Sequence, residues 1–502
     1  MTSVELPGAT RVALISVYEL GRPSAALASA QAALKRAGHR VRVFDASVEA
    51  PEAGDAAVAD AGLVAISVPM HTALRLGVEI ARRVRAIHPH AHIAMFGLYA
   101  WLNARHLLGA TADSVIGGEH EAPLVALADR LACGSNVSTT GNTPIPGLTT
   151  RAGLEASGVI APPNLARPQS TALDRAGFQP LARHAALIGP RPGQQRVAGH
   201  VEASRGCLHR CLHCPITPVY GGRFFVVPAE VVLADIAQQV SAGARHISFG
   251  DPDFLCGPRH ALEIARALHA AHRDLSFDAT VKIEHVLKQR DLWPELATLG
   301  CVFVLSAVES LSDRVLAALE KGHTRADVYR AIDILETAGI ALRPSLMPFT
   351  PWATLDDYLD LVDFACDPRM TGCVDPIQLA IRLLIPPGSA LLARDRSAPW
   401  LGELVADDFG HRWTHPDPAL DRLHAEVSQM IDARSAEPNP DPACVLRQIR
   451  ERAYAAAGRV APNLPPAPPR FVPRLTEAWF CCAEPSHAQR ARADGAARGV
   501  FV

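Results

Sequence analysis

From residue 11 to about 132, short apolar runs alternate with stretches whose apolar residues recur at helical spacing. The apolar runs of β type are "RVALISVY", "RVRVFDAS", "LVAISVPM", "HIAMFGLYA" and "DSVIGG". Such alternation predicts βαβ units and therefore an α/β domain with a doubly wound parallel sheet. Ligands of these sheets bind at the carboxyl ends of the strands. No GxGxxG follows the first run, so a dinucleotide is not indicated.

The chain from 134 to 195 is rich in Gly, Ser, Thr, Asn and Pro, which predicts a long connector with little structure. A second alternating series then runs through "HVEASRGC", "HISFGDPDF", "SFDATVKIEH", "CVFVLSAVES", "IALRPSLMPF" and "PIQLAIRLLIPPGS". These six units predict a partial parallel (β/α)6 barrel with active residues at the strand ends.

After about residue 400 the pattern becomes helical and then Pro-rich. We therefore expect four regions: a Rossmann-like domain at 8–133, a linker at 134–195, the barrel at 196–395, and a helical C-terminal region at 396–502.

The charge and cysteine content narrow the function classes. A net charge of -2 over 502 residues offers no field for nucleic acid or an anionic membrane. The start lacks a basic segment followed by a long apolar core, and no run of about 18 apolar residues occurs, so we expect a cytoplasmic protein. Its 11 cysteines are then expected to be reduced thiols, which makes a tight cysteine cluster a metal-site candidate.

One such cluster lies in "CLHRCLHCP", where Cys207, Cys211 and Cys214 have the spacing C-x3-C-x2-C. A structural zinc site would need a fourth ligand, which His209 or His213 could supply, but no second pair with finger spacing follows. Three thiolates on an iron-sulfur cubane leave one iron without a protein ligand, and that iron can bind a substrate or cofactor directly. The zinc site stays the alternative.

The segment "RGCLHRCLHCP" after the first strand of a partial barrel resembles the radical S-adenosylmethionine (radical SAM) superfamily. The resemblance implies a 4Fe-4S cluster held by Cys207, Cys211 and Cys214, whose open iron chelates S-adenosylmethionine. It also implies reductive cleavage of a carbon-sulfur bond, and a reductase or flavodoxin-type protein as the electron donor.

Other strand ends match the same family. "FGDPDF" resembles the loop that receives the methionine amino group, and "SAVES" resembles the segment near the ribose and carboxylate. In "TVKIEH", the alternation of side chains along a strand puts two charged residues on one face. The candidate cofactor-binding residues are therefore Gly250, Asp251, Asp253, Lys282, Glu284, Ser306 and Glu309. A helix cap or a satisfied ion pair is the alternative for each.

The N-terminal domain, with "GGEHEAP" at 117–123, resembles the cobalamin-binding domains of one radical SAM subclass. The D-x-H-x-x-G loop that supplies a histidine to cobalt is absent, since the corresponding loop reads "SVYELGRPS". The resemblance thus implies either cobalamin bound without that ligand or a retained scaffold that buries a substrate. His71, in a later loop, is interpreted as an ordinary polar residue.

The tail "WFCCAEP" carries vicinal thiols, Cys481 and Cys482, which cannot readily pair with each other but are soft ligands. The whole layout resembles the radical SAM proteins with a CUAEP/CCAEP tail, where U is selenocysteine. That group includes a radical enzyme of arsinothricin biosynthesis. The resemblance implies carbon-arsenic bond formation, in which the 3-amino-3-carboxypropyl group of S-adenosylmethionine is transferred to arsenite to give hydroxyarsinothricin. Cys481 and Cys482 would be the catalytic residues that present the metalloid.

Two other functions remain open. One is a cobalamin-dependent radical methyltransferase that acts on a natural-product precursor. The other is an iron-sulfur or arsenic-binding sensor, which the lack of a nucleic-acid-reading element or basic patch disfavours.

Overall fold

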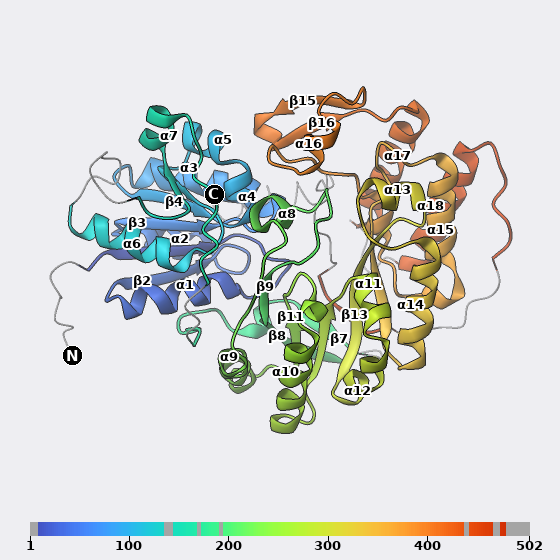
Figure 1. Ribbon diagram of the computed structural model, residues 1–502, viewed down its shortest axis with the longest axis horizontal. Coiled ribbons are helices and arrows are strands. Elements are labelled where there is room, and N and C mark those ends of the chain that lie inside the picture. Colours follow the sequence, from blue (N-terminus) through green and yellow to red (C-terminus); the bar gives the residue numbers. More distant parts are fainter. Residues whose placement is uncertain are drawn as a thin grey trace.

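The structure is a computed structural model that describes residues 9–134, 144–167, 172–189, 194–435, 441–464 and 472–477. Two mainly parallel sheets organise it, one in the N-terminal third of the chain and one in the central part (Figure 1). Among these residues, no helix combines the length and the apolar character needed to cross a membrane.

The N-terminal sheet has the strand order β2-β1-β3-β4-β5-β6. Its parallel strands are β1 (Arg11–Ser16), β2 (Arg40–Asp45), β3 (Leu63–Ser67), β4 (His92–Phe96) and β5 (Ser114–Ile116), and β6 (Leu148–Thr150) joins antiparallel to β5. The order confirms the expected doubly wound sheet. Because β1 lies between β2 and β3, the topological switch point is at the carboxyl ends of β1 and β3.

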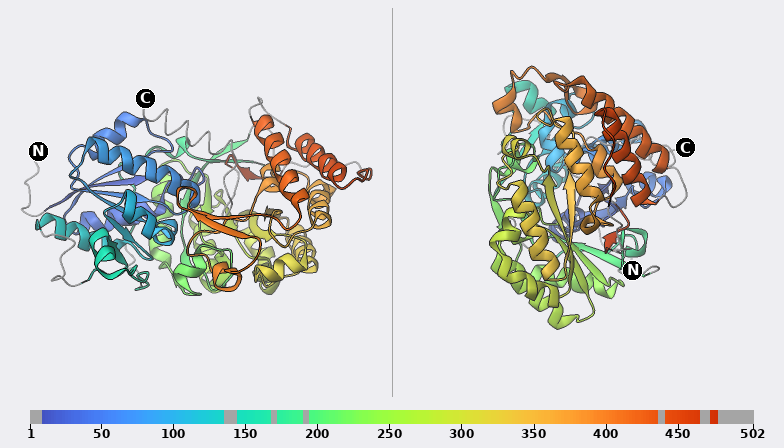
Figure 2. Two further views of the ribbon diagram at one scale, coloured as in Figure 1. Left: turned by 90° about the horizontal axis from the view of Figure 1, so that it is seen from above. Right: turned by 90° about the vertical axis from the view of Figure 1, so that its right-hand side faces the viewer.

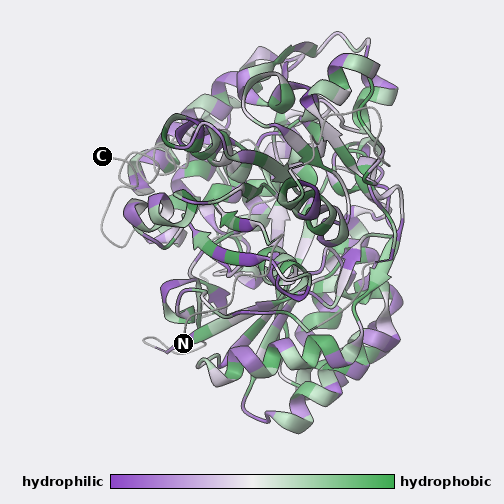
Figure 3. Ribbon diagram, turned by 90° about the vertical axis from the view of Figure 1, so that its left-hand side faces the viewer, coloured by the Kyte–Doolittle hydropathy of each residue, from purple (hydrophilic) through white to green (hydrophobic). Residues whose placement is uncertain are grey.

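Helices cover both faces of this sheet because successive side chains of a strand point to opposite sides. Val12 and Leu14 of β1 pack in one core with α1 (Ala25–Arg36) and α6 (Glu121–Ala132). Ala13 and Ile15 pack in another core with the helices on the opposite face, which are α2 (Pro51–Val58), α3 (His71–Ile87), α4 (Leu98–Leu102) and α5 (Ala104–Ala110). Figure 3 shows hydrophobic and hydrophilic residues alternating along the helices that cover this domain.

The second sheet is the open half-barrel that the sequence predicts. Five neighbouring strands are parallel: β8 (Gln195–Val201), β11 (His246–Phe249), β12 (Ser276–Thr280), β13 (Cys301–Glu309) and β14 (Ala341–Leu346). The crossover helices are α9 (Ala229–Ser241), α10 (Pro258–Ala271), α11 (Ile283–Lys288), α12 (Trp293–Thr298), α13 (Asp313–Ala318), α14 (Arg325–Thr337) and α15 (Leu355–Cys366).

At the sixth barrel position, the run "PIQLAIRLLIPPGS" forms the 3-10 helix η5 (Pro376–Ala380) and a single parallel bridge between Phe349 and Arg382. Pro376 and the pair at 386–387 cannot donate backbone hydrogen bonds, so this run cannot form a long ladder.

The connector contains more regular structure than its composition predicts. Besides β6, it holds α7 (Arg151–Ser157), η1 (Leu181–Arg183) and β7 (Ala186–Ile188). β7 pairs antiparallel with β8, and β17 (Arg474–Leu475) pairs antiparallel with β7. These short strands find partners in sheets built elsewhere in the chain, a tertiary effect that local composition does not reveal.

The C-terminal region, expected to be helical, also contains a hairpin of β15 (Leu401–Val405) and β16 (Gly410–Trp413) after α16 (Leu391–Asp395). Phe409 at its turn packs in the same core as α3 and α5 of the N-terminal domain. The helices α17 (Pro418–Ser435) and α18 (Pro442–Ala456) instead pack in the barrel core, beside α15. Figure 2 shows the hairpin between the N-terminal domain and the barrel.

The loop after β1 lies where the two sheets meet, and it contains a perturbed carboxyl group. Ser24 Oγ donates a hydrogen bond of 2.5 Å to Glu19 Oε1. Burial, reinforced by the charges of Glu202 and Asp45, raises the pKa of Glu19 to about 8. The folded chain therefore holds the Glu19 proton up to about pH 8, whereas a carboxyl group in the unfolded chain releases it near pH 4.5.

The free energy of unfolding should consequently fall as the pH rises from 4.5 to 8. Glu19→Gln stays neutral at every pH. We expect this variant to be more stable than the wild type by about 1 kcal/mol or more at pH 8, and the difference to shrink towards pH 4.5. Chemical denaturation at both pH values measures this, with Glu155→Gln on the exposed side of α7 as the control. An equal difference at both pH values would contradict the assignment.

Candidate active site

The three clustered cysteines lie on one loop between β9 (Ser204–Gly206) and α8 (Ile216–Tyr220). β9 pairs with β10 (Phe224–Val226), and Cys207 N donates a hydrogen bond of 3.0 Å to Arg223 O. Gly206 has a φ of +73°, and a Cβ there would lie 2.4 Å from Arg223 O, so only glycine allows the loop to leave the strand in this way. The loop ends in a turn in which Cys214 N donates to Cys211 O at 3.2 Å.

The charges of two lysines act on the thiols of this loop. Cys207 and Cys211 are buried, Cys214 is partly buried, and none of the three forms a disulfide with another described cysteine. Burial raises the pKa of Cys211, while the charges of Lys321 and Lys282 oppose that rise. Three thiol donors on one loop beside two cations fit a 4Fe-4S cluster, because each bound thiolate adds negative charge that these lysines offset.

Lys321 is buried beside Glu309 at the end of β13. Glu309 Oε1 accepts hydrogen bonds from Lys321 Nζ at 3.2 Å and His213 Nε2 at 3.3 Å. Burial alone would raise the pKa of Glu309, but the charge of Lys321 and the bond from His213 lower it to about 2. Glu309 has a φ of +65°, a left-handed conformation that non-glycine residues seldom adopt. Glu309 thus holds the cysteine loop in place through its hydrogen bond with His213.

Buried polar atoms without partners lie near the same strand end. Ser306 Oγ, His213 Nδ1 and His323 Nδ1 are buried and have no hydrogen-bond partner among the described residues. Buried polar groups are nearly always hydrogen-bonded, so these atoms indicate a position for a polar ligand. Ser306 Oγ, one of the predicted cofactor-binding groups, is among these atoms.

The second predicted loop is occupied by its own contacts. A Cβ at Gly250 would lie 2.2 Å from His200 Nε2, so this glycine permits close packing. Asp251 is buried and accepts hydrogen bonds from Ala203 N at 3.0 Å and from Ser204 Oγ. Burial raises the pKa of Asp251 to about 7. Asp251 therefore supports the strand that precedes the cysteine loop.

Asp253 is also engaged by the protein. Its Oδ2 atom accepts hydrogen bonds from His209 Nε2 at 3.1 Å and His285 Nδ1 at 2.7 Å, and its Oδ1 atom accepts one from Leu255 N at 3.2 Å. Burial would raise the pKa of Asp253, but the two histidines lower it. The sequence pattern suggests His209 only as a possible fourth zinc ligand and assigns no role to His285, which lies 76 residues further along the chain.

The predicted strand face of Lys282 and Glu284 is wrong. β12 ends at Thr280, Lys282 is the N-cap residue of α11, and Glu284 lies in the first turn of that helix. A carboxylate in the first turn favours a helix start at this point. The two side chains still meet, since Lys282 Nζ lies 3.6 Å from Glu284 Oε2, and the ammonium also acts on Cys211.

The segment "GGEHEAP" provides a charged contact between the two halves of the chain. Arg205, two residues before Cys207, places Nη1 2.7 Å from Glu119 Oε2 and 2.6 Å from Glu121 Oε1. Its Nε lies 3.3 Å from Glu202 Oε2. Burial opposes the ionisation of Arg205, but the three carboxylates raise its pKa.

The glycine pair of this segment is covered by the chain itself. A Cβ at Gly117 would lie 2.3 Å from Trp101 Cδ1, and one at Gly118 would lie 2.2 Å from Asn164 O. Gly118 and Asn164 form a parallel β-bridge. Nearby, His71 Nε2 is 2.8 Å from Asp408 O and so faces the protein. Other parts of the chain therefore cover both glycines and hold His71.

The remaining predicted site residues, Cys481 and Cys482, lie outside the described residues. The last described residues before them in the sequence are those of β17 and the two that follow it.

Comparisons with known proteins agree with this geometry. Residues 201–365 match the radical SAM superfamily. The hopanoid C-3 methylase of Methylococcus capsulatus is 21% identical over 324 residues, which make up 64% of this chain and 59% of that protein. The chain covers only 41% of the length of the first curated relatives that it matches.

Two solved structures share the fold over most of the chain. OxsB, a cobalamin-dependent S-adenosylmethionine radical enzyme with aqua-cobalamin and S-adenosylmethionine bound, has a TM-score of 0.66 at 15% identity, covering 89% of this chain and 72% of OxsB. The radical S-adenosylmethionine methyltransferase TsrM from Kitasatospora setae, with cobalamin and a 4Fe-4S cluster bound, has a TM-score of 0.61 at 17% identity, covering 89% of this chain and 99% of TsrM. The N-terminal sheet followed by the half-barrel is therefore a fold known from solved enzymes.

Removing the buried guanidinium should destabilise the protein strongly. Arg205→Met leaves Glu119, Glu121 and Glu202 without their shared cation, and we expect a loss of about 3–5 kcal/mol in the free energy of unfolding. The control is Arg266→Met, whose partner Glu295 is exposed, and it should change stability little. Denaturant titration of both variants measures this, and similar losses in the two would contradict a special role for Arg205.

Proposed function

We propose that this chain, whose residues 201–365 form a radical SAM domain, is an enzyme that cleaves S-adenosylmethionine reductively. Cys207, Cys211 and Cys214 would hold the 4Fe-4S cluster that this reaction needs. The proposal is carried by the loop that presents three thiols beside Lys282 and Lys321 at the carboxyl end of the half-barrel. When bound there, a 4Fe-4S cluster supplies the electron that breaks a carbon-sulfur bond.

The residues around the loop have separate tasks in this proposal. Lys321 and Lys282 offset the charge of the thiolates, and Glu309 holds Lys321 and His213 in place. Ser306 Oγ donates or accepts a hydrogen bond with the cofactor's polar groups, because no described residue does so. The small-molecule substrate then approaches from the side on which the N-terminal domain lies.

The finer proposal is transfer of the 3-amino-3-carboxypropyl group of S-adenosylmethionine to arsenite, with Cys481 and Cys482 as ligands of arsenic. In support of it, Glu477, the last described residue before these thiols in the sequence, is bound at the carboxyl ends of the strands of the N-terminal sheet. Tyr18 OH, just beyond the end of β1, donates a hydrogen bond of 2.6 Å to Glu477 Oε1. The four residues from Glu477 to Cys481 span at most about 14 Å when extended.

The small products of anaerobic turnover test both levels of this proposal. With a chemical reductant, S-adenosylmethionine and arsenite, we expect methylthioadenosine together with an organoarsenical that carries the 3-amino-3-carboxypropyl group. Cys211→Ala should abolish both. Mass spectrometry of the small molecules provides the measurement.

The tail thiols are tested in the same assay. The variants Cys481→Ala and Cys482→Ala should lose the organoarsenical, whereas Cys133→Ala, an exposed thiol of the N-terminal domain, should keep it. If the wild type formed only 5'-deoxyadenosine and no organoarsenical, the arsenic proposal would fail while the radical SAM assignment remained.

Ser306→Ala tests the placement of the cofactor. Loss of one hydrogen bond to S-adenosylmethionine should raise the KM for S-adenosylmethionine roughly two- to tenfold, because such a bond contributes about 0.5–1.5 kcal/mol. Iron content should stay unchanged, since Ser306 is not a ligand of the cluster in this proposal. An unaltered KM would place the cofactor elsewhere.

A second candidate is cobalamin-dependent methyl transfer, which the fold shared with OxsB and TsrM favours. Cobalt analysis of protein produced with cobalamin supplied decides between the two: bound cobalt and a methylated product would support methyl transfer.

A further inference from the structure

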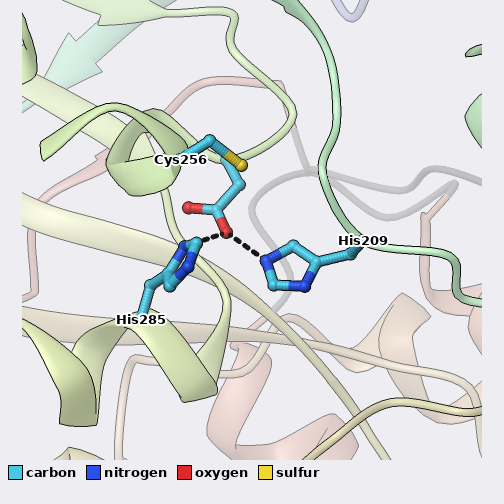
Figure 4. A group of neighbouring side chains, drawn as sticks. His209, Cys256 and His285 are labelled. Atoms are coloured by element: carbon cyan, nitrogen blue, oxygen red, sulfur yellow. Dashed lines mark hydrogen bonds and ion pairs between the residues drawn. The ribbon is translucent and has the colours of Figure 1, made fainter. Parts of the chain in front are cut away.

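A second group of metal-binding side chains lies beside the cysteine loop. His209, Asp253, Cys256 and His285 each offer one ligand atom, and these atoms all lie within 4.8 Å of one another. Figure 4 shows the side chains converging, with the carboxylate between the two imidazoles. They come from three segments: the cysteine loop, the 3-10 helix η2 (Phe254–Cys256) with its N-cap, and α11.

The geometry of the group is compact and mostly buried. The imidazole rings of His209 and His285 have centroids 4.8 Å apart, and both rings direct a nitrogen at Asp253 Oδ2. Asp253 is only 1% exposed, so its charge requires a cation or strong donors nearby. The thiol of Cys256 lies on the side of the group that faces Cys207.

A further carboxylate stands behind one of the imidazoles. Glu284 Oε2 lies 3.6 Å from His209 Nδ1, the ring nitrogen that does not face Asp253. Histidines that bind metals commonly direct their second nitrogen at a carboxylate, which fixes the ring orientation. The group therefore has ligand atoms and an orienting residue around them.

We propose that His209, Asp253, Cys256 and His285 bind one divalent transition-metal ion, separate from the three cysteines of the loop. Two imidazoles, one thiolate and one carboxylate are ligands that suit tetrahedral Zn²⁺, and they also bind Fe²⁺. The two negative ligands balance the charge of the ion. This is a different site from a zinc finger on Cys207, Cys211 and Cys214, because its only sulfur ligand is Cys256.

The alternative occupant of this group is a proton. Without a metal, Asp253 would accept hydrogen bonds from both histidines, as the distances of 3.1 Å and 2.7 Å allow. Metal content distinguishes the two states directly, because a group that prefers protons would retain no zinc after desalting.

A metal here would tie the cysteine loop to the barrel. His209 stands between Cys207 and Cys211, whereas Asp253 and Cys256 follow β11 and His285 follows β12. The ion would therefore fix the middle of the loop against two strand ends. This role does not depend on which substrate the protein uses, so the site can be tested without an activity assay.

The experiment measures zinc and iron together in the full-length protein after anaerobic cluster reconstitution, brief exposure to Zn²⁺ and desalting. We expect one equivalent of zinc beyond the cluster iron in the wild type. His285→Gln should lose the zinc and keep the iron. The matched control is His246→Gln, which removes a fully buried histidine 2.8 Å from Asp278 that does not belong to this group.

Cobalt provides a second, spectroscopic readout. Co²⁺ in place of zinc should give the visible bands of a tetrahedral site together with a thiolate charge-transfer band, and Cys256→Ser should remove the charge-transfer band alone. The proposal is overturned if the wild type retains no more zinc than His285→Gln. It is also overturned if Cys214→Ala loses the zinc while His285→Gln keeps it, because the ion would then belong to the loop cysteines.

Discussion

The buried guanidinium of Arg205 is the interaction on which the arrangement of the two halves depends. It is surrounded by Glu119 and Glu121 from the N-terminal domain and by Glu202 from its own strand region. Separating the halves would take Glu119 and Glu121 away from Arg205. The loss of its partner destabilises a buried charge far more than a surface one. Because Arg205 is two residues before Cys207, the position of the cysteine loop is set by both domains.

The sheets could be predicted because parallel strands buried on both faces are nearly continuous apolar runs. Every residue of β3 is buried, and its sequence, "LVAIS", shows this directly. The hairpin of β15 and β16 could not be predicted in this way, since β15 is mostly exposed and has no apolar run. β6 and β7 have three residues each and depend on partners that the local sequence does not identify.

The residues of the candidate site could likewise be predicted only where their signal is local in the sequence. The spacing of Cys207, Cys211 and Cys214 is local, so the sequence alone identified the loop and its chemistry. The contacts of Asp253 are not local, because His285 comes from another βα unit. Its hydrogen bond, with that of His209, engages the carboxylate that the sequence assigns to the cofactor. Lys321 likewise has no local signal in the sequence. Its charge nevertheless acts on Cys211, and its ammonium group donates a hydrogen bond to Glu309.

The pairing of β17 with β7 has a consequence for the order in which the molecule is built. β7 lies at the edge of the barrel sheet until β17 has been synthesised, and β17 follows every other described helix and strand in the sequence. An uncovered strand edge is a site of mispairing during folding. The edge of the barrel sheet is therefore covered only after all the other described elements have been synthesised, although β7 itself precedes the first barrel strand.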